Sequence, residues 1–313
     1  MIITITLNSC IDRSLLVSDF QVGKTFLAED VKLCAAGKGI NVSRVLDCMG
    51  LASKALVVTG KDTASFFESS FEGSLISPHI ISHSGITRIN TTIVSPKAKE
   101  THIREAGTAL PASTWQEVAD FLENSVHEGD LVAFCGSLPL STDLSIWKNL
   151  LSLAKKKHAF VLVDTSKQAL VAALETKISA ITVNLEEFCF LTKSQQFEMD
   201  SIAFEAQKEV QKRDMKWITV TFADKGAVLV EKNSILKHKA YNIELTSSVG
   251  AGDAFVAGML FGMHQNIDKA KTLAIATACG AAACEKAIAG SISLNRVEYF
   301  LGYSVLPSKF ISL

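Results

Sequence analysis

The sequence lacks an excess of charge of either sign. Its 313 residues contain 31 Lys and Arg against 32 Asp and Glu, which gives a formal net charge of −1. Without a strong overall field, the chain has no general attraction for nucleic acid or for an anionic membrane surface. We therefore expect no nucleic-acid partner and no membrane partner, and any nucleotide must bind at a local site.

The sequence also lacks the segments that direct proteins into or across membranes. Residues 1–7 contain no basic leader and alternate like a β-strand. The longest apolar runs, 254–263 and 273–284, are too short and too rich in Ala and Gly to span a bilayer. The seven cysteines form no CxxC pair of the metal-binding kind, and we expect them to be reduced. These features predict a soluble, cytoplasmic protein.

Two common nucleotide-binding fingerprints are absent as well. No Gly-x-x-x-x-Gly-Lys-Ser/Thr spacing occurs around Lys38, so the glycines beside it do not form a Walker loop. Nor does a Gly-x-Gly-x-x-Gly motif follow a buried strand, which argues against a dehydrogenase.

What the chain does contain is an alternation of strand-like and helical segments. β-branched or apolar runs occur at 2–7, 55–59, 131–134, 160–163, 178–183 and 217–222. Amphipathic helical patterns separate them, for example at 114–125 and 144–156. This order predicts an α/β fold with a largely parallel central sheet and helices on both faces.

The stretch Gly250-Ala251-Gly252-Asp253 joins a loop to an apolar helical pattern. Its glycines leave the backbone amides open to a ligand, and the positive end of the following helix favours an anion. A carboxylate repels an anion there unless it has a chemical task, such as accepting the proton of an attacking hydroxyl in phosphoryl transfer. The stretch thus predicts Asp253 as a general base and Gly250, Ala251 and Gly252 as an anion site. The simpler alternative is a tight turn with an acid in the first helical turn.

This stretch, continued by Ala254-Phe255, resembles the C-terminal signature of the ribokinase and phosphofructokinase-B family of sugar kinases. Other matches follow in the family's order: Asn8 with Asp12, Gly37-Lys38-Gly39-Ile40-Asn41, Gly136-Ser137-Leu138-Pro139 and Asn184-Leu185-Glu186-Glu187. The chain departs from the family by Ala36 in the N-terminal signature and by Ala223 in the nucleotide loop, where the family has glycine. Agreement in order and context is far more specific than a single short motif.

The resemblance implies a ribokinase-like fold with a small β-sheet lid over the sugar. The whole chain, 1–313, is then a single kinase domain, with lid segments at approximately 12–34 and 86–106. In this family the lid often mediates dimerisation, so a homodimer through the lid is implied.

The resemblance also implies the binding residues. Asp12, Gly37, Lys38 and Asn41 would contact the sugar. Without the resemblance, Lys38 is better interpreted as a solvated loop charge. Nucleotide binding would involve Asn184, Glu187, Thr221, Gly226 and Gly252, with Glu187 acting on Mg²⁺ through water. Asn184 and Glu187 also fit a helix capping box, and the two roles are compatible. ATP and Mg²⁺ are the implied cofactors, and a requirement for a monovalent cation is left open.

Residues 86–94 alternate so that Arg88, Asn90 and Thr92 share one polar face of a strand. A guanidinium matches phosphate oxygens in a bidentate way, so we expect Arg88 to bind a phosphate already present on the substrate. Lys24, at the turn of the other lid segment, is the expected second cation. The alternative is that Arg88 is a solvated strand residue.

Within the family the chain looks most like the branch of 1-phosphofructokinase and tagatose-6-phosphate kinase. We therefore expect ATP-dependent phosphorylation of fructose 1-phosphate, tagatose 6-phosphate or fructose 6-phosphate. The chain departs from this branch in the presumed lid, with Phe26-Leu27 in place of Asn-Arg and Thr101-His102-Ile103-Arg104 in place of Thr-Glu-Ile-Asn. A kinase for another sugar or a nucleoside, and a sugar-phosphate-binding regulator without turnover, are the alternatives.

Overall fold

The computed structural model of the chain describes residues 1–95, 100–286 and 288–305. Within these residues, a main sheet of nine strands has the order β13-β12-β11-β10-β9-β8-β1-β4-β5. Strands from β5 across to β11 run parallel to their neighbours, and β12 and β13 continue the sheet in antiparallel pairs. The predicted largely parallel sheet is thereby confirmed. In spatial order the strands are β13 (Ile235–His238), β12 (Ala227–Val230), β11 (Trp217–Thr221), β10 (Ala180–Asn184), β9 (Phe160–Asp164), β8 (Leu131–Cys135), β1 (Ile2–Thr6), β4 (Ser53–Gly60) and β5 (Ile76–His83).

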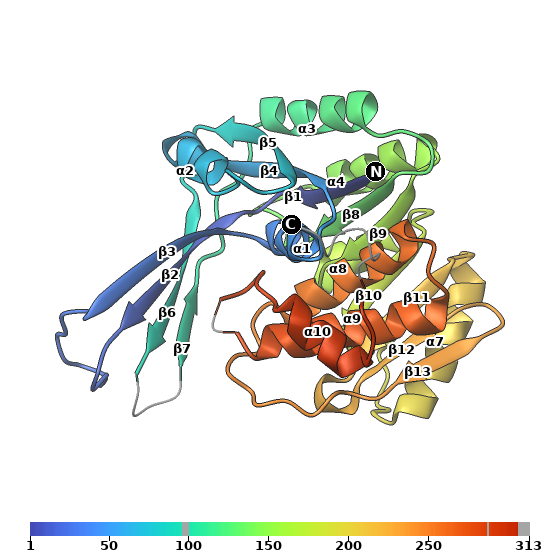
Figure 1. Cartoon of the computed structure of the whole chain (residues 1–313). Helices are drawn as coiled ribbons and strands as arrows, with labels where there is room; N and C mark the ends of the chain where they lie inside the picture. Colours follow the sequence, from blue (N-terminus) through green and yellow to red (C-terminus); the bar gives the residue numbers. More distant parts are fainter. Residues whose placement is uncertain (96–99, 287, 306–313) are drawn as a thin grey trace.

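Helices cover both faces of this sheet (Figure 1). Because successive side chains of a strand point to opposite faces, Ile3 and Ile5 of β1 join the core under one helical layer and Ile2 joins the core under the other. The first layer contains α3 (Ala112–Ser125), α4 (Leu144–Lys156), α5 (Lys167–Ala173), α6 (Leu185–Thr192) and α7 (Met199–Arg213). The second contains α1 (Lys38–Cys48), α2 (Ala64–Ser69), α8 (Ala251–His264), α9 (Lys269–Cys284) and α10 (Leu294–Leu301). Among the helices of the described residues, none has the length and apolar character needed to cross a bilayer.

A second sheet, the lid, projects from the main body at the lower left of Figure 1. Its order over the described residues is β3-β2-β6-β7, with β2 and β6 parallel and both outer pairs antiparallel. The strands are β2 (Cys10–Leu16), β3 (Asp30–Ala36), β6 (Arg88–Val94) and β7 (Thr101–Arg104). The lid predicted from the two inserted segments is therefore present. Asp12 lies within β2.

The carboxyl ends of the parallel strands share one edge of the main sheet. In α/β folds this edge is where ligands bind. Here it brings together Asn8 after β1, Asp164 at the end of β9, Asn184 at the end of β10 and Thr221 at the end of β11. The lid strands and the starts of α1 and α8 lie at the same edge (Figure 1), which makes it the candidate site.

Candidate active site

Asp253 lies in the first turn of α8 and is only 6% exposed. Its Oδ2 accepts a hydrogen bond of 2.8 Å from Nδ2 of Asn41 in α1. Two segments that are 212 residues apart in the sequence thus fix one carboxylate, because α1 and α8 pack side by side on the same face of the sheet.

Burial raises the pKa of Asp253 to about 6. Lys38 and the hydrogen bond from Asn41 oppose this rise, while the charge of Asp164 adds to it. A carboxylate with a pKa close to neutrality is well matched to take up a proton during turnover. The environment of Asp253 therefore suits the base predicted from the sequence.

The turn before α8 depends on Gly250, which caps the helix with φ 85°. A Cβ at Gly250 would lie 2.9 Å from Cβ of Ala289, so a larger residue is excluded by both conformation and packing. Gly252 differs, because a Cβ built there has no other atom of the described residues within 4 Å. The space in front of the first turn of α8 is open at Gly252, and internal packing does not require a glycine there.

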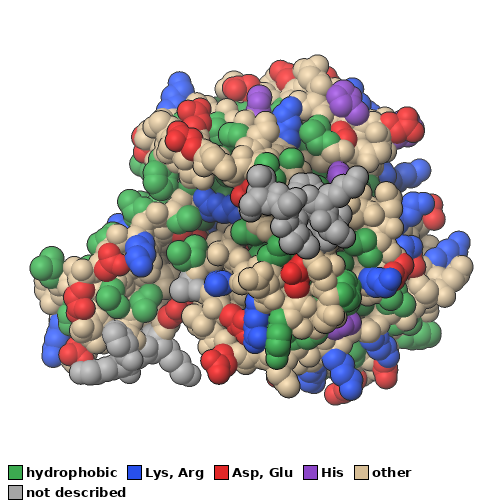
Figure 2. Space-filling model, in the orientation of Figure 1, with side chains coloured by type: hydrophobic (Ala, Val, Ile, Leu, Met, Phe, Trp, Pro, Cys, Tyr) green, Lys and Arg blue, Asp and Glu red, His purple; other side chains and the backbone are tan. Residues whose placement is uncertain are grey.

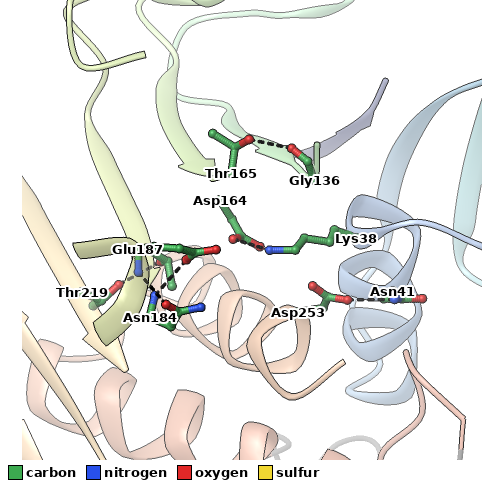
Figure 3. A network of polar contacts seen from close by, with 10 residues as sticks. Lys38, Asn41, Gly136, Asp164, Thr165, Asn184, Glu187, Thr219 and Asp253 are labelled. Carbon is green, nitrogen blue, oxygen red and sulfur yellow. Dashed lines mark hydrogen bonds and ion pairs between the residues drawn. The ribbon is translucent and has the colours of Figure 1, made fainter. Parts of the chain in front are cut away.

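Lys38, the first residue of α1, forms an ion pair of 2.8 Å with Oδ1 of Asp164 (Figure 3). Burial disfavours a charge on Lys38, but Asp164, Asp253 and Glu187 together raise its pKa above the usual value. The carboxylate of Asp164 is 6% exposed, and its Oδ2 is buried without a hydrogen-bond partner among the described residues. A buried, unpaired carboxylate oxygen is costly unless it receives a ligand.

Asn184 and Glu187 form the capping box at the start of α6. The Glu187 amide donates to Oδ1 of Asn184 at 2.8 Å, and the Asn184 amide donates to Oε2 of Glu187 at 3.0 Å. Burial raises the pKa of Glu187, against the opposing effects of the Asn184 amide and Lys38. The alternative capping role is therefore real, and the Glu187 carboxylate also belongs to the electrostatic network of Lys38 and Asp164 (Figure 3).

The donor set suits a magnesium ion that keeps its waters. Among the described residues, no group of three or more His, Cys, Asp or Glu side chains can enclose a metal. Mg²⁺ is usually held by one or two carboxylates together with substrate phosphates and water. Glu187 and the unpaired Oδ2 of Asp164 supply two such carboxylates at one edge of the sheet.

In the lid, Oδ1 of Asp12 accepts a hydrogen bond of 3.0 Å from Nδ2 of Asn90. Nδ2 of Asn90 also approaches Sγ of Cys10 at 3.1 Å, and Oδ1 of Asn90 is buried without a partner among the described residues. Burial and the charge of Asp12 raise the pKa of the Cys10 thiol, which keeps it protonated. Asp12 lies close enough to Asp253 for its charge to add to the raised pKa of Asp253.

Arg88 connects the lid to the main sheet. Its Nη2 donates to the carbonyl of Asn8 at 2.9 Å, its Nε lies between the carbonyls of Asn8 and Ser9, and its Nη1 donates to the carbonyl of Glu105 at 3.3 Å. These contacts use three of the five N–H groups of the guanidinium. Arg88 is therefore not the solvated strand residue of the alternative interpretation. Lys24 lies in the exposed connection between β2 and β3, beyond the end of the paired strands.

Gly37 caps α1, and Thr221 is paired with Asn184 at the edge of the sheet. Gly226 follows the turn after β11, where any side chain would collide with the carbonyl of His238. This collision is a structural reason for glycine that does not involve a nucleotide. Asp164 was not among the site residues predicted from the sequence, although its position at the end of a buried strand was a usable signal.

Comparison with known protein families matches residues 3–295 to the "pfkB family carbohydrate kinase". The chain is 30% identical to 1-phosphofructokinase of Haemophilus influenzae over 302 residues, which cover 96% of each chain. Phosphofructokinase-2 of Escherichia coli in complex with potassium superposes with a TM-score of 0.91 at 22% identity, covering 96% of this chain and 98% of that one. The same enzyme in complex with fructose-6-phosphate gives 0.88, also at 22% identity, covering 96% and 99%. At this identity the structural likeness shows a shared fold.

Proposed function

The chain belongs to the pfkB family of carbohydrate kinases, and we propose that it transfers the γ-phosphoryl group of ATP to a hydroxyl of a ketohexose phosphate. Fructose 1-phosphate is the first candidate substrate, and tagatose 6-phosphate and fructose 6-phosphate are the others. The likeness to a 1-phosphofructokinase over almost the full length of the chain supports this choice.

The observation that carries the proposal is the position of Asp253. It is a buried carboxylate, held by Asn41, with a pKa of about 6 at the start of a helix whose first turn is open to solvent at Gly252. The substrate hydroxyl attacks the γ-phosphorus, its proton passes to the carboxylate of Asp253, and the bond to the leaving ADP oxygen breaks. Amides around Gly250, Ala251 and Gly252, aided by the helix dipole, stabilise the charge on the transferred group.

Glu187 and Asp164 are proposed to hold Mg²⁺, Glu187 through a bound water. When bound, the ion would neutralise charge on the phosphates of ATP. Lys38, which Asp164 holds by an ion pair of 2.8 Å, keeps a positive charge at the same edge of the sheet. Asn184, Thr221 and Gly226 are proposed to line the nucleotide.

The sugar is proposed to bind between α1 and the lid. Gly37, Lys38 and Asn41 would contact it from α1, and Asp12 would accept hydrogen bonds from its hydroxyls. Since Asn90 already donates to Oδ1 of Asp12, Oδ2 is the oxygen that remains for the substrate. Arg88, through its two uncommitted N–H groups, and Lys24 are proposed to bind the phosphate that the substrate already carries.

A homodimer through the lid is also proposed, and the face of the lid that is turned away from Asp12 supports it. Leu33 pairs with Arg13, and Ile103 pairs with Thr91, so both lie on that face. Val31, Leu33 and Ile103 are 52%, 56% and 55% exposed, and exposed hydrophobic side chains are visible on the lid in Figure 2. We expect light scattering to give the mass of a dimer, and Leu33→Asp to give that of a monomer. A monomeric wild-type protein would refute the proposal.

The function is tested by an ADP-coupled assay of the three sugar phosphates, fructose, tagatose and a set of nucleosides, with Mg-ATP and with or without potassium. We expect a sugar phosphate to have the highest kcat/KM. A preference for an unphosphorylated sugar or a nucleoside would refute the choice of a sugar phosphate as substrate, and only the assignment as a kinase would remain. Binding of sugar phosphates without turnover would favour the regulator.

A further inference from the structure

We propose that Arg104, on the edge strand β7 of the lid, binds the phosphate that the substrate carries before the reaction and so selects phosphorylated sugars. This inference rests on the proposed function and adds a specificity residue to it. It follows from the register of the lid strands and from the contacts of the two lid arginines.

Asp12, Asn90 and Arg104 form one row across three adjacent strands. Asp12 pairs with Asn90 between β2 and β6, and Asn90 pairs with Arg104 between β6 and β7. Directly paired residues project from the same face of a sheet. The hydrogen bond from Asn90 to Asp12 confirms this for the first pair, and the 3.1 Å contact of Thr92 with His102 confirms it for the neighbouring row of β6 and β7. Arg104 therefore shares the face of Asp12.

That face is turned toward the candidate site, because Arg88, two residues before Asn90 and on the same face of β6, donates to the carbonyl of Asn8 at the carboxyl edge of the main sheet. Neighbouring strands are about 4.8 Å apart, so Asp12 and Arg104 lie about 10 Å from each other across the sheet. The long side chain of Arg104 can extend its guanidinium across part of this distance toward a ligand at Asp12. A sugar bound through its hydroxyls at Asp12 thus places a terminal phosphate within reach of Arg104.

Arg104 is also the arginine on this face that is free to bind an anion. Its side chain is exposed and makes no hydrogen bond or ion pair with the residues that the structure describes. All five N–H groups of the guanidinium are therefore available. Arg88, by contrast, donates to three backbone carbonyls. Lys32, paired with Ser14 on the same face, has a carboxylate of Asp30 at 3.5 Å. A guanidinium without a carboxylate partner suits a phosphate dianion.

The test compares phosphorylated and unphosphorylated ligands in Arg104→Gln, Arg104→Lys and wild type. Each protein is assayed with fructose 1-phosphate, tagatose 6-phosphate and fructose 6-phosphate, and with fructose and tagatose as substrates or competitive inhibitors. Arg13→Gln is the charge control, because it removes the same charge from the opposite face of the same sheet, where Arg13 contacts Thr91. That face is the proposed dimer interface, so light scattering checks that Arg13→Gln and Arg104→Gln both have the mass of the wild-type protein.

We expect Arg104→Gln to lower kcat/KM for the preferred sugar phosphate by about tenfold to a hundredfold, the equivalent of a charge-assisted hydrogen bond of about 1.5–3 kcal/mol. The loss should appear mainly in KM, Arg104→Lys should restore part of it, and Arg13→Gln should not reproduce it. Constants for fructose and tagatose should change by less than about threefold, because they lack the phosphate that Arg104 binds.

Two results would overturn the inference while leaving the proposed function intact. One is wild-type kcat/KM in Arg104→Gln with the preferred sugar phosphate. The other is an equal loss for phosphorylated and unphosphorylated ligands, which would mean that Arg104 acts only on the charge of Asp12. If the wild-type enzyme prefers no sugar phosphate, the proposed function fails first and the role of Arg104 fails with it.

Discussion

Gly252→Ala adds a single methyl group, and we expect it to change stability and turnover in opposite directions. Gly252 is exposed in the first turn of α8, and within the described part of the chain a Cβ there has no neighbouring atom within 4 Å. Exchanging glycine for alanine in a helical conformation stabilises a protein by about 0.4–1 kcal/mol, because the unfolded chain loses freedom. We expect the unfolding temperature of Gly252→Ala to rise by about 0.6–1.5 °C, because a chain of 313 residues has a large entropy of unfolding.

Turnover should change in the opposite direction. The added methyl group occupies the open space in which the transferred phosphoryl group is proposed to approach the amides of the turn. Displacing a reacting group by about 1 Å costs about a hundredfold in rate, so we expect kcat to fall by about that factor. The assays are thermal unfolding without ligands and ADP-coupled turnover at saturating ATP and sugar phosphate.

The same substitution at Gly258 is the control within α8. A Cβ at Gly258 would lie 2.5 Å from Cα of Ala276 in α9, so Gly258→Ala should lower the unfolding temperature. Wild-type turnover in Gly252→Ala would refute the proposed path of the phosphoryl group. An unfolding temperature below that of wild type would refute the interpretation of the space at Gly252 as open.

Asp253→Asn should lower kcat by about 10²–10⁴ with little change in ATP affinity, and wild-type turnover in the folded variant would remove Asp253 as the base. In the wild type, kcat/KM should fall as the pH drops below about 6, where Asp253 becomes protonated. The pKa of Asp253 is higher in the folded state than in the unfolded state, so ionisation of Asp253 destabilises the fold as the pH rises from about 4 to about 6. Asp253→Asn removes this ionisation, so its unfolding temperature should exceed that of the wild type by more at pH 7 than at pH 4. Glu187→Gln keeps an oxygen for the capping box, so it should fold normally but lose activity and need more Mg²⁺. If the dependence of activity on magnesium is unchanged, Glu187 has only the capping role. Arg88→Gln should lower the free energy of unfolding by about 1–3 kcal/mol and lower kcat/KM for the sugar phosphate, whereas Arg104→Gln should leave unfolding unchanged. Equal unfolding temperatures for the two variants would contradict the role of Arg88 at the base of the lid.

The class of fold and the local parts of the site can be predicted from the sequence alone. β-branched runs alternating with amphipathic helices require a covered parallel sheet, and each strand then delivers its last residues to one edge. The turn at Gly250, the start of α8 at Ala251 and the capping box of Asn184 with Glu187 depend on residues within four positions of one another. Such features are readable because their physical causes are local.

Contacts between groups that are distant in the sequence become evident in the folded chain. Nothing near Asp253 in the sequence indicates that Asn41 donates a hydrogen bond to it, and nothing near Lys38 indicates that it forms an ion pair with Asp164. Arg88 and Arg104 look alike in the sequence, yet backbone carbonyls engage the first, while the described part of the chain leaves the second exposed on the same polar face. Hydrogen bonds and ion pairs of this kind depend on strand order, register and helix packing, which local residue patterns do not encode.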